Sequence, residues 1–235
     1  MTKTSRSPSP RPAGLTRELI VDAAIRLLDA HGESGLTFRA LALELETGHG
    51  AIQWHVANKA ELLVAATVGA LTPALEKPVP GTSAQRAVQA VALGVFDALD
   101  AHPWIAAQLF AVPWQPAMVQ LWEQLARPLD ELGVPDDTLF TAVSTLVSYI
   151  VGVASQNARN AHAVAGDRSR DEVLDAVARH WEDVDPAEHP FVRRLAGRLR
   201  AHDDRHELLA GLDIILAGLV TGSDGRRRTH RHSLG

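Results

Sequence analysis

The 235-residue sequence contains no cysteine. This absence excludes disulfide bonds, thiolate metal sites, zinc fingers and cysteine nucleophiles, and it fits a reducing compartment. Long apolar runs are absent as well, since the best candidate, residues 214–220, is far shorter than the ~18 residues that span a membrane. The basic N-terminal segment is followed by no apolar stretch, as a secretory signal requires. We therefore expect a cytoplasmic protein with no membrane partner.

Basic residues are fewer than acidic ones: the chain has 23 Lys and Arg and 28 Asp and Glu, which gives a net charge of −5. This balance argues against a protein that coats nucleic acid along its whole surface. The charge is unevenly distributed: residues 1–17 sum to +4, residues 18–60 to −3 and residues 61–235 to −6. A small DNA-contacting motif remains compatible with this distribution.

A helical period runs through most of the chain, and no convincing alternating strand pattern is present. We predict an all-α fold in two parts, divided at the proline- and glycine-rich stretch 73–81. N-cap residues are expected at Thr16, Thr37, Asn58, Thr82 and Ser169. The expected helices cover residues 16–30, 37–45, 48–55, 58–71, 82–101, 103–111, 115–132, 136–161, 169–180, 191–201 and 204–221. Both ends, a basic arm at 1–13 and a tail at 223–235, are expected to be disordered.

Residues 36–59 read LTFRALALELETGHGAIQWHVANK and carry the clearest functional pattern. A short helix, a glycine-containing turn and a second short helix form a helix-turn-helix. The second helix of such a motif fits the DNA major groove with its first residues at base edges, while helix N-termini hold phosphates with free amides.

This segment, within a domain of residues 14–60, resembles the DNA-binding domain of the tetracycline-repressor (TetR) family of transcriptional regulators. The resemblance is carried by Gly32, Leu36, Thr37, Arg39, Gly50, Ala51, Ile52, Trp54, His55, Val56, Asn58, Lys59, Glu61, Leu62 and Leu63. It implies phosphate contacts for Thr37, Arg39 and Lys59. It also implies that His49, Gly50 and Ala51 face base edges, with further base or backbone contacts from Gln53, Trp54 and His55.

Two residues depart from the family pattern. Glu46 replaces a usual glycine and puts an acid near the DNA, where phosphate repels it unless the side chain points away. Gln53 replaces an aromatic residue, and it either reads adenine through N6 and N7 or merely solvates the helix. The basic arm likewise either tracks the DNA or is a solvated tail.

Residues 82–222, reached through a connecting helix and linker at 61–81, resemble more loosely the family's ligand-binding and dimerisation domain. The resemblance implies that the last helix and the long helix before it form a four-helix bundle with a second subunit. The expected interface residues are Leu139, Val143, Val147, Ile150, Gly211, Ile214, Ile215 and Gly218, and internal packing is the alternative. A homodimer would place two recognition helices on half-sites of a palindrome.

Aromatic residues concentrate in the middle of this second part, where the family's inducer cavity lies. They suggest an apolar or aromatic effector and are Phe96, Trp104, Phe110, Trp114, Trp122 and Phe140. Core packing is the alternative, and for any single one of these residues it is the favoured interpretation.

The sequence offers little support for catalysis. His202 and His206 have the spacing of a zinc-binding HExxH motif, but Asp replaces the essential Glu and no third ligand is apparent. A helix start capped by aspartate explains the same residues. We therefore expect a DNA-binding regulator without cofactor, metal or catalytic residues, most simply a repressor released from a palindromic operator by a small effector. The alternative is a ligand-binding protein or enzyme with a degenerate helix-turn-helix.

Overall fold

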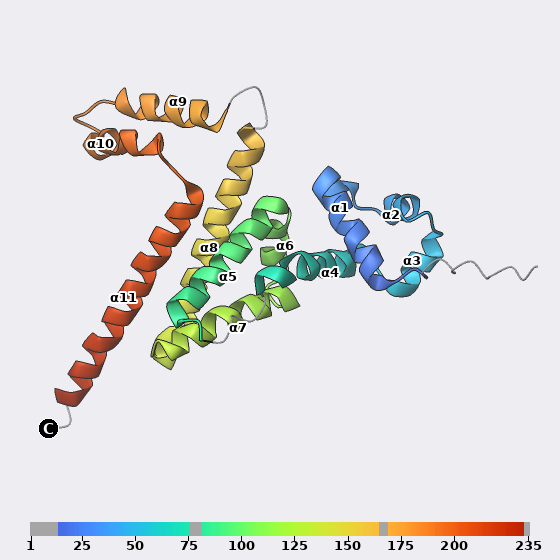
Figure 1. Ribbon diagram of the computed structural model, residues 1–235, viewed down its shortest axis with the longest axis horizontal. Coiled ribbons are helices and arrows are strands. Elements are labelled where there is room, and N and C mark those ends of the chain that lie inside the picture. Colours follow the sequence, from blue (N-terminus) through green and yellow to red (C-terminus); the bar gives the residue numbers. More distant parts are fainter. Residues whose placement is uncertain (1–13, 76–80, 165–168, 233–235) are drawn as a thin grey trace, which may run out of the picture. The chain divides into compact units, whose positions relative to one another are not determined.

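The structure is a computed structural model that describes residues 14–75, 81–164 and 169–232, and within these ranges its regular elements are all helices (Figure 1). The all-α prediction is therefore confirmed. The chain divides into two compact units, Met1–Gly69 and Ala70–Gly235. The expected basic arm, residues 1–13, lies outside the described residues.

The first unit contains α1 (Arg17–Gly35), α2 (Phe38–Glu44), α3 (His49–His55) and most of α4 (Lys59–Leu71). The predicted caps are present: Thr16, Thr37 and Asn58 accept hydrogen bonds from backbone N–H groups three residues further on, at 3.3, 3.1 and 2.9 Å. Gly32 interrupts α1 with a φ of 64°, a left-handed conformation that suits glycine. These local signals explain why the helix boundaries follow the sequence closely.

A small core holds the first unit together. The apolar stripe of α1 is buried, and so are Leu41, Ile52, Val56 and Leu62 from the other three helices and their connections. Ion pairs lie at its rim, where Arg17 meets Glu61 at 2.9 Å and Arg26 meets Glu44 at 2.7 Å. The three helices of the motif are thus fixed by a shared core and by charged pairs between helices.

The second unit begins with the end of α4 and a short 3₁₀ turn (Thr72–Leu75). Its helices are α5 (Ala84–Ala101), α6 (Ile105–Ala111), α7 (Pro116–Glu131), α8 (Asp136–Val164), α9 (Arg170–Glu182), α10 (Pro190–Leu199) and α11 (Asp204–His232). The α8 helix packs against α5 and α7, α11 lies against α8 and α5, and α9 pairs with α10 in a hairpin (Figure 1).

The long helix α8 is strongly apolar over most of its length. Residues 136–161 are long and apolar enough to cross a membrane by composition alone, but a buried core helix meets the same criterion. Much of this apolar surface is buried, including Leu146, Ile150 and Val151. Packing against α5 and α7 therefore accounts for the apolar character of α8.

Two boundaries differ from the sequence expectation. Ser83, not Thr82, caps α5, since its Oγ accepts a hydrogen bond from the Arg86 N–H at 3.4 Å. The last helix, α11, continues to His232, whereas the sequence suggests an end at Thr221 and a disordered tail beyond it. Propagating an established helix costs little, and arginine is a good helix former, so the arginine run 226–228 can extend it. Residues 233–235 lie outside the described residues.

Candidate functional site

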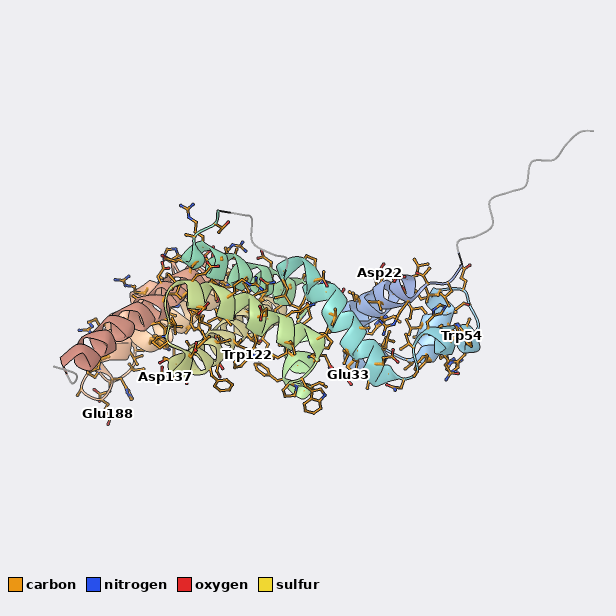
Figure 2. The ribbon with its side chains drawn as sticks, turned by 90° about the horizontal axis from the view of Figure 1, so that it is seen from below. Asp22, Glu33, Trp54, Trp122, Asp137 and Glu188 are labelled. Atoms are coloured by element: carbon orange, nitrogen blue, oxygen red, sulfur yellow. The ribbon has the colours of Figure 1, made fainter. Side chains whose placement is uncertain are left out.

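The α3 helix presents one face to the core and the other to solvent. Ile52 is 0% exposed and Val56, which follows the helix, is 1% exposed, so these two residues anchor it. The opposite face carries Trp54, 87% exposed, which stands on the outside of the unit (Figure 2). His49, Gly50, Ala51 and Gln53 are exposed as well, and His55 is half-buried. The residues that the resemblance assigns to base edges therefore share a free surface.

The turn between α2 and α3 sets the direction in which α3 leaves. Thr47 donates a backbone hydrogen bond to the Ala42 carbonyl at 3.0 Å, and Glu46 donates one to the Leu43 carbonyl at 3.3 Å. These two bonds form a Schellman motif, whose C′ residue adopts the left-handed conformation and is usually glycine. Glu46 occupies that position with a φ of 49°. The positive φ at this position explains why the family usually has glycine here. The Glu46 side chain is exposed, and its backbone conformation is strained.

The expected phosphate contacts have different surroundings. Thr37 caps α2 with its side chain, and Arg39 is exposed two residues further on. Lys59, at the start of α4, is already engaged: its Nζ donates to the Glu33 carbonyl at 2.6 Å and lies 4.0 Å from the Glu33 carboxylate. This ammonium must therefore exchange Glu33 for a phosphate or bridge both.

The start of α4 is fixed by a second carboxylate. Glu61 accepts hydrogen bonds from the Ala57 backbone N–H and from Arg17, both at 2.9 Å. These two contacts hold the pKa of Glu61 below its usual value, and the hydrogen bond from the Ala57 backbone is the larger cause. The N-terminus of α4 is thereby tied to the N-terminus of α1.

Most of the described Arg and Lys side chains in the first unit stabilise its own structure. Of the described Arg and Lys residues there, Arg17, Arg26 and Lys59 pair with acids. Arg39 is exposed and has no ion-pair partner among the described residues. The free face of α3 therefore offers shape and hydrogen-bonding groups more than positive charge, and its histidines, His49 and His55, are its basic side chains.

The six aromatic residues expected around an effector have different surroundings. Phe96 is buried in the core, while Trp122 packs on Phe140 with ring centroids 5.1 Å apart. Phe140 is 72% exposed, and Trp114 is also largely exposed. Trp104 lies 6.0 Å from the His102 ring. The effector prediction for these residues as a group therefore stays a prediction, and core packing describes Phe96.

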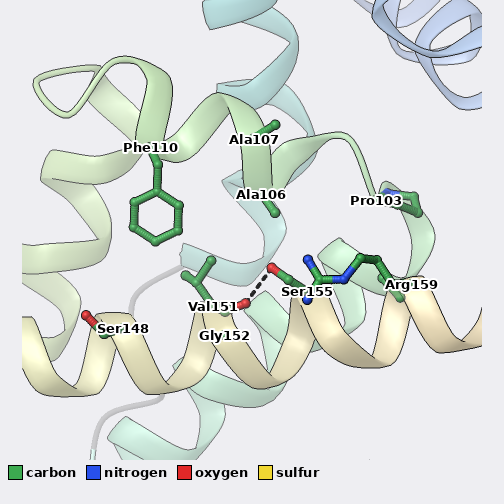
Figure 3. A pocket seen from close by; sticks show the side chains of 10 residues that line it. Pro103, Ala106, Ala107, Phe110, Ser148, Val151, Gly152, Ser155 and Arg159 are labelled. Atoms are coloured by element: carbon green, nitrogen blue, oxygen red, sulfur yellow. Dashed lines mark hydrogen bonds between the residues drawn. The ribbon is translucent and has the colours of Figure 1, made fainter.

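A groove of about 500 Å³ lies between α6 and α8. On the α6 side, the lining includes Pro103, Ala106 and Phe110. Figure 3 shows that the Phe110 ring extends from α6 towards α8. Its α8 wall includes Gly152 and Arg159. Phe110 is the one member of the predicted aromatic set in this lining.

The expected dimer residues divide into two groups. Val143, Val147 and Ile150 are buried within the chain's own core, so the prediction that they face a second subunit is wrong for these three. The apolar period of α8 marks its contact with α5 and α7 instead. Leu139 is half-buried.

The α11 residues of that set also differ among themselves. A Cβ on Gly211 would lie 1.9 Å from the Tyr149 hydroxyl, so this glycine accommodates Tyr149 of the same chain. Internal packing thus explains Gly211. Ile214 is 74% exposed, Gly218 is exposed and Ile215 is half-buried, and for these three the interface assignment stays a prediction.

The paired histidines at the start of α11 are explained by helix capping. Asp203 accepts a hydrogen bond from the His206 backbone N–H at 2.6 Å, as the aspartate-cap interpretation predicts. His202 lies 3.2 Å from Asp204, which also binds Arg170. Among the described residues, no group of three His, Asp or Glu side chains is placed to hold a metal ion.

Sequence reasoning missed Arg159, Gly152 and Glu33. Ser148, Gly152, Ser155 and Arg159 follow one another at spacings of four, three and four, which places small and polar side chains along one stripe of an apolar helix. This spacing could have predicted from the sequence that the stripe lines a groove. The contact of Lys59 with Glu33 had no comparable signal, because it joins residues 26 positions apart.

An exposed recognition helix on a three-helix core, followed by a separate helical unit, defines a helix-turn-helix transcriptional regulator. The model of the bacterial tetR regulatory proteins matches residues 20–66, and that of the tetracyclin repressor-like C-terminal domain matches residues 77–222. The chain therefore belongs to the TetR family, whose members are ligand-responsive DNA-binding regulators.

Individual relatives agree with this assignment. The transcriptional regulator SCO7222 of Streptomyces coelicolor is 48% identical, with a TM-score of 0.81 over 88% of this chain and 98% of that one. ActR of the same organism, in complex with actinorhodin, is 28% identical with a TM-score of 0.74, over 90% and 98%. The transcriptional repressor DrrR1 of Streptomyces coeruleorubidus is 30% identical over 64% of this chain, and the chain spans only 57% of the length of DrrR1.

Proposed function

We propose that the chain acts in the cytoplasm as a homodimeric repressor that binds a palindromic operator and is released by a small effector. The observation that carries the proposal is the free face of α3, where Trp54 and Gln53 project from a helix anchored by the buried Ile52. A protruding helix of this kind fits the major groove. DrrR1 is named as a repressor and ActR was crystallised with actinorhodin, which supports both halves of the proposal.

The dimer follows from the size of the recognition helix. With seven residues, α3 reaches only a few base pairs, so specificity requires a second copy about one helical turn away. The exposed Ile214 and Gly218 on α11 are the proposed contact residues. An enzyme with a degenerate motif is less favoured, because the chain belongs to a family of DNA-binding regulators.

The proposed contacts divide into two kinds. His49, Gly50, Ala51, Gln53, Trp54 and His55 face bases or the adjacent backbone, while Thr37, Arg39 and Lys59 bind phosphates. Because few cations are free, affinity depends on dimeric site recognition rather than on bulk charge.

Fluorescence anisotropy with fragments retained from the source genome tests this function. We expect the wild-type dimer to bind a palindromic fragment, and His55→Ala and Lys59→Ala to weaken that binding. Lys59→Ala should lower the slope against log salt by about one per subunit, or about two for the dimer. Arg127→Ala, on the exposed surface of α7, is the control and leaves binding unchanged. Absence of binding to every fragment at low salt would refute the proposal.

Effector control requires that the two units communicate. The α4 helix runs unbroken across the division between Gly69 and Ala70, so a ligand in the second unit can act on the start of α4 near Asn58. The ligand must bind one dimer conformation better, and each tenfold preference is worth about 1.4 kcal/mol. Spin labels at Asn58 in both subunits should change their separation when an effector releases DNA. An unchanged separation would exclude this mechanism.

A further inference from the structure

The groove between α6 and α8 holds a cation in apolar surroundings. Figure 3 shows the guanidinium of Arg159 directed along α8 towards Ser155, inside the groove. None of the ten lining residues is acidic, and Arg159 has no ion-pair partner among the described residues. The remaining lining is mostly apolar and includes Ala106, Phe110 and Val151. Arg159 is itself exposed, so its guanidinium is open to solvent and can be reached by an anion that enters the groove.

We propose that this groove binds an organic anion with a flat apolar body, its carboxylate paired with Arg159 and its body lying between α6 and Val151. A planar guanidinium matches a carboxylate through two parallel hydrogen bonds. At the other end, the Phe110 ring offers an aromatic face. The inference rests on the proposed function in one respect: the anion would be the effector.

The shape of the groove agrees with this class of ligand. A volume of about 500 Å³ falls within the range of small-molecule sites, roughly 300–1,000 Å³. Gly152 forms part of its floor, and a Cβ built there meets no atom within 4 Å, so the missing side chain contributes to the depth. Ser148 is exposed at the floor and can bond a polar group on the ligand body.

The Ser155 hydroxyl is committed elsewhere. Its Oγ donates to the Val151 carbonyl at 2.5 Å, as the dashed line in Figure 3 shows. It therefore cannot donate the same proton to an anion, and Arg159 is the donor on which the charged group of the ligand depends.

Calorimetric titration of the full-length protein without DNA tests the site. The probes are 2-naphthoate and its neutral counterpart 2-naphthamide, which share a flat body and differ in charge. We expect the wild type to bind naphthoate saturably and the amide about tenfold more weakly. Arg159→Gln should reduce the affinity for naphthoate to that for the amide and leave the amide within twofold.

Two further variants separate the groove from general effects. Gly152→Leu fills the groove and should weaken both probes, while its fold is kept because the position is open and leucine favours helix. Arg198→Gln, which removes an exposed arginine from α10, is the control for charge and should alter neither probe. Circular dichroism and molecular mass by light scattering are recorded for each variant.

The outcomes are distinct. Absent or non-saturable naphthoate binding, or equal binding by Arg159→Gln, overturns the anion site. A changed mass of Gly152→Leu with unchanged naphthoate affinity also overturns it and assigns the groove to a second copy of the chain. Naphthoate bound through Arg159 that leaves the operator complex intact refutes the effector role alone. Failure of the wild type to bind any DNA refutes the proposed function and leaves the anion site standing.

Discussion

The helices α3 and α8 both have a buried face and a free face, but the free faces are opposite in form. Over seven residues, α3 exposes large side chains, of which Trp54 is the most prominent. The 29-residue helix α8 exposes small side chains along its middle part, at Thr145, Ser148 and Gly152. One surface protrudes and is suited to enter a groove in a partner, whereas the other is recessed and is suited to receive one. Side-chain size on the free face, more than polarity, separates the two roles.

The largest expected effect comes from removing the anchor of α3. Ile52→Ala should lower the free energy of unfolding of the first unit by about 2–5 kcal/mol, because the residue is fully buried and a cavity remains. Chemical denaturation followed by circular dichroism measures it. A loss below about 0.5 kcal/mol would mean that α3 is not held by its buried face. The statement that α3 and α8 both have a stabilising buried face would then be wrong.

The next effect concerns the protruding face itself. Trp54→Ala should weaken operator binding by about 1–3 kcal/mol per subunit, or about 10- to 100-fold, since it removes contact area from the groove-facing surface. Stability should change by no more than about 0.5 kcal/mol, because the side chain is exposed. Anisotropy titrations give the affinity, and Leu43→Ala, at an exposed position on α2, is the matched control. Equal losses in the two variants would contradict the assigned role of Trp54.

A smaller effect is expected at the turn that directs α3. Glu46→Gly should stabilise the first unit by about 1 kcal/mol, because glycine adopts a positive φ without steric cost. Glu46→Gln retains the strain and removes only the charge. We expect both variants to bind the operator more tightly, and only the glycine variant to melt at a higher temperature. If Glu46→Gln binds no better than wild type, the carboxylate points away from the DNA.

The smallest effect is expected in the α9–α10 hairpin. Arg200 bonds Asp175 at 2.8 Å and Glu182 at 2.6 Å, and these hydrogen bonds lower the pKa of both carboxyl groups. The ordinary pKa values are 3.8 for Asp175 and 4.5 for Glu182, and the stabilisation is complete when the pH is above them. It is lost as the pH falls through the lowered pKa values of the folded state. Amide exchange should therefore accelerate in α9 and α10 under acid before it does in α8. Arg200→Gln should abolish this difference, and simultaneous opening of all three helices would contradict the explanation.

The sequence predicted the first unit well because its signals are local. Thr16, Thr37 and Asn58 act as caps through hydrogen bonds that span three residues, and the left-handed turn follows from a short motif. The second unit was harder to predict, because α8 is apolar on more than one side. The family resemblance implied that Val143 and Ile150 are interface residues, although tertiary packing places them in the core. Gly211 was likewise expected at the subunit interface, but the side chain next to it, Tyr149, belongs to the same chain.

The contact between Tyr149 and α11 supplies an intrinsic optical probe. Tyr149 is the single tyrosine of the chain, and its hydroxyl donates to the Glu207 carbonyl at 3.0 Å and lies 3.3 Å from that of Leu208. Burial of the phenol is the main cause that raises the pKa of Tyr149 above its usual value, and the nearby charge of Glu207 raises it further. Tryptophan does not ionise in this range, so the near-ultraviolet absorbance change at alkaline pH comes from this one phenol. An unlabelled sample therefore reports whether α11 stays seated on α8 when an effector or operator binds.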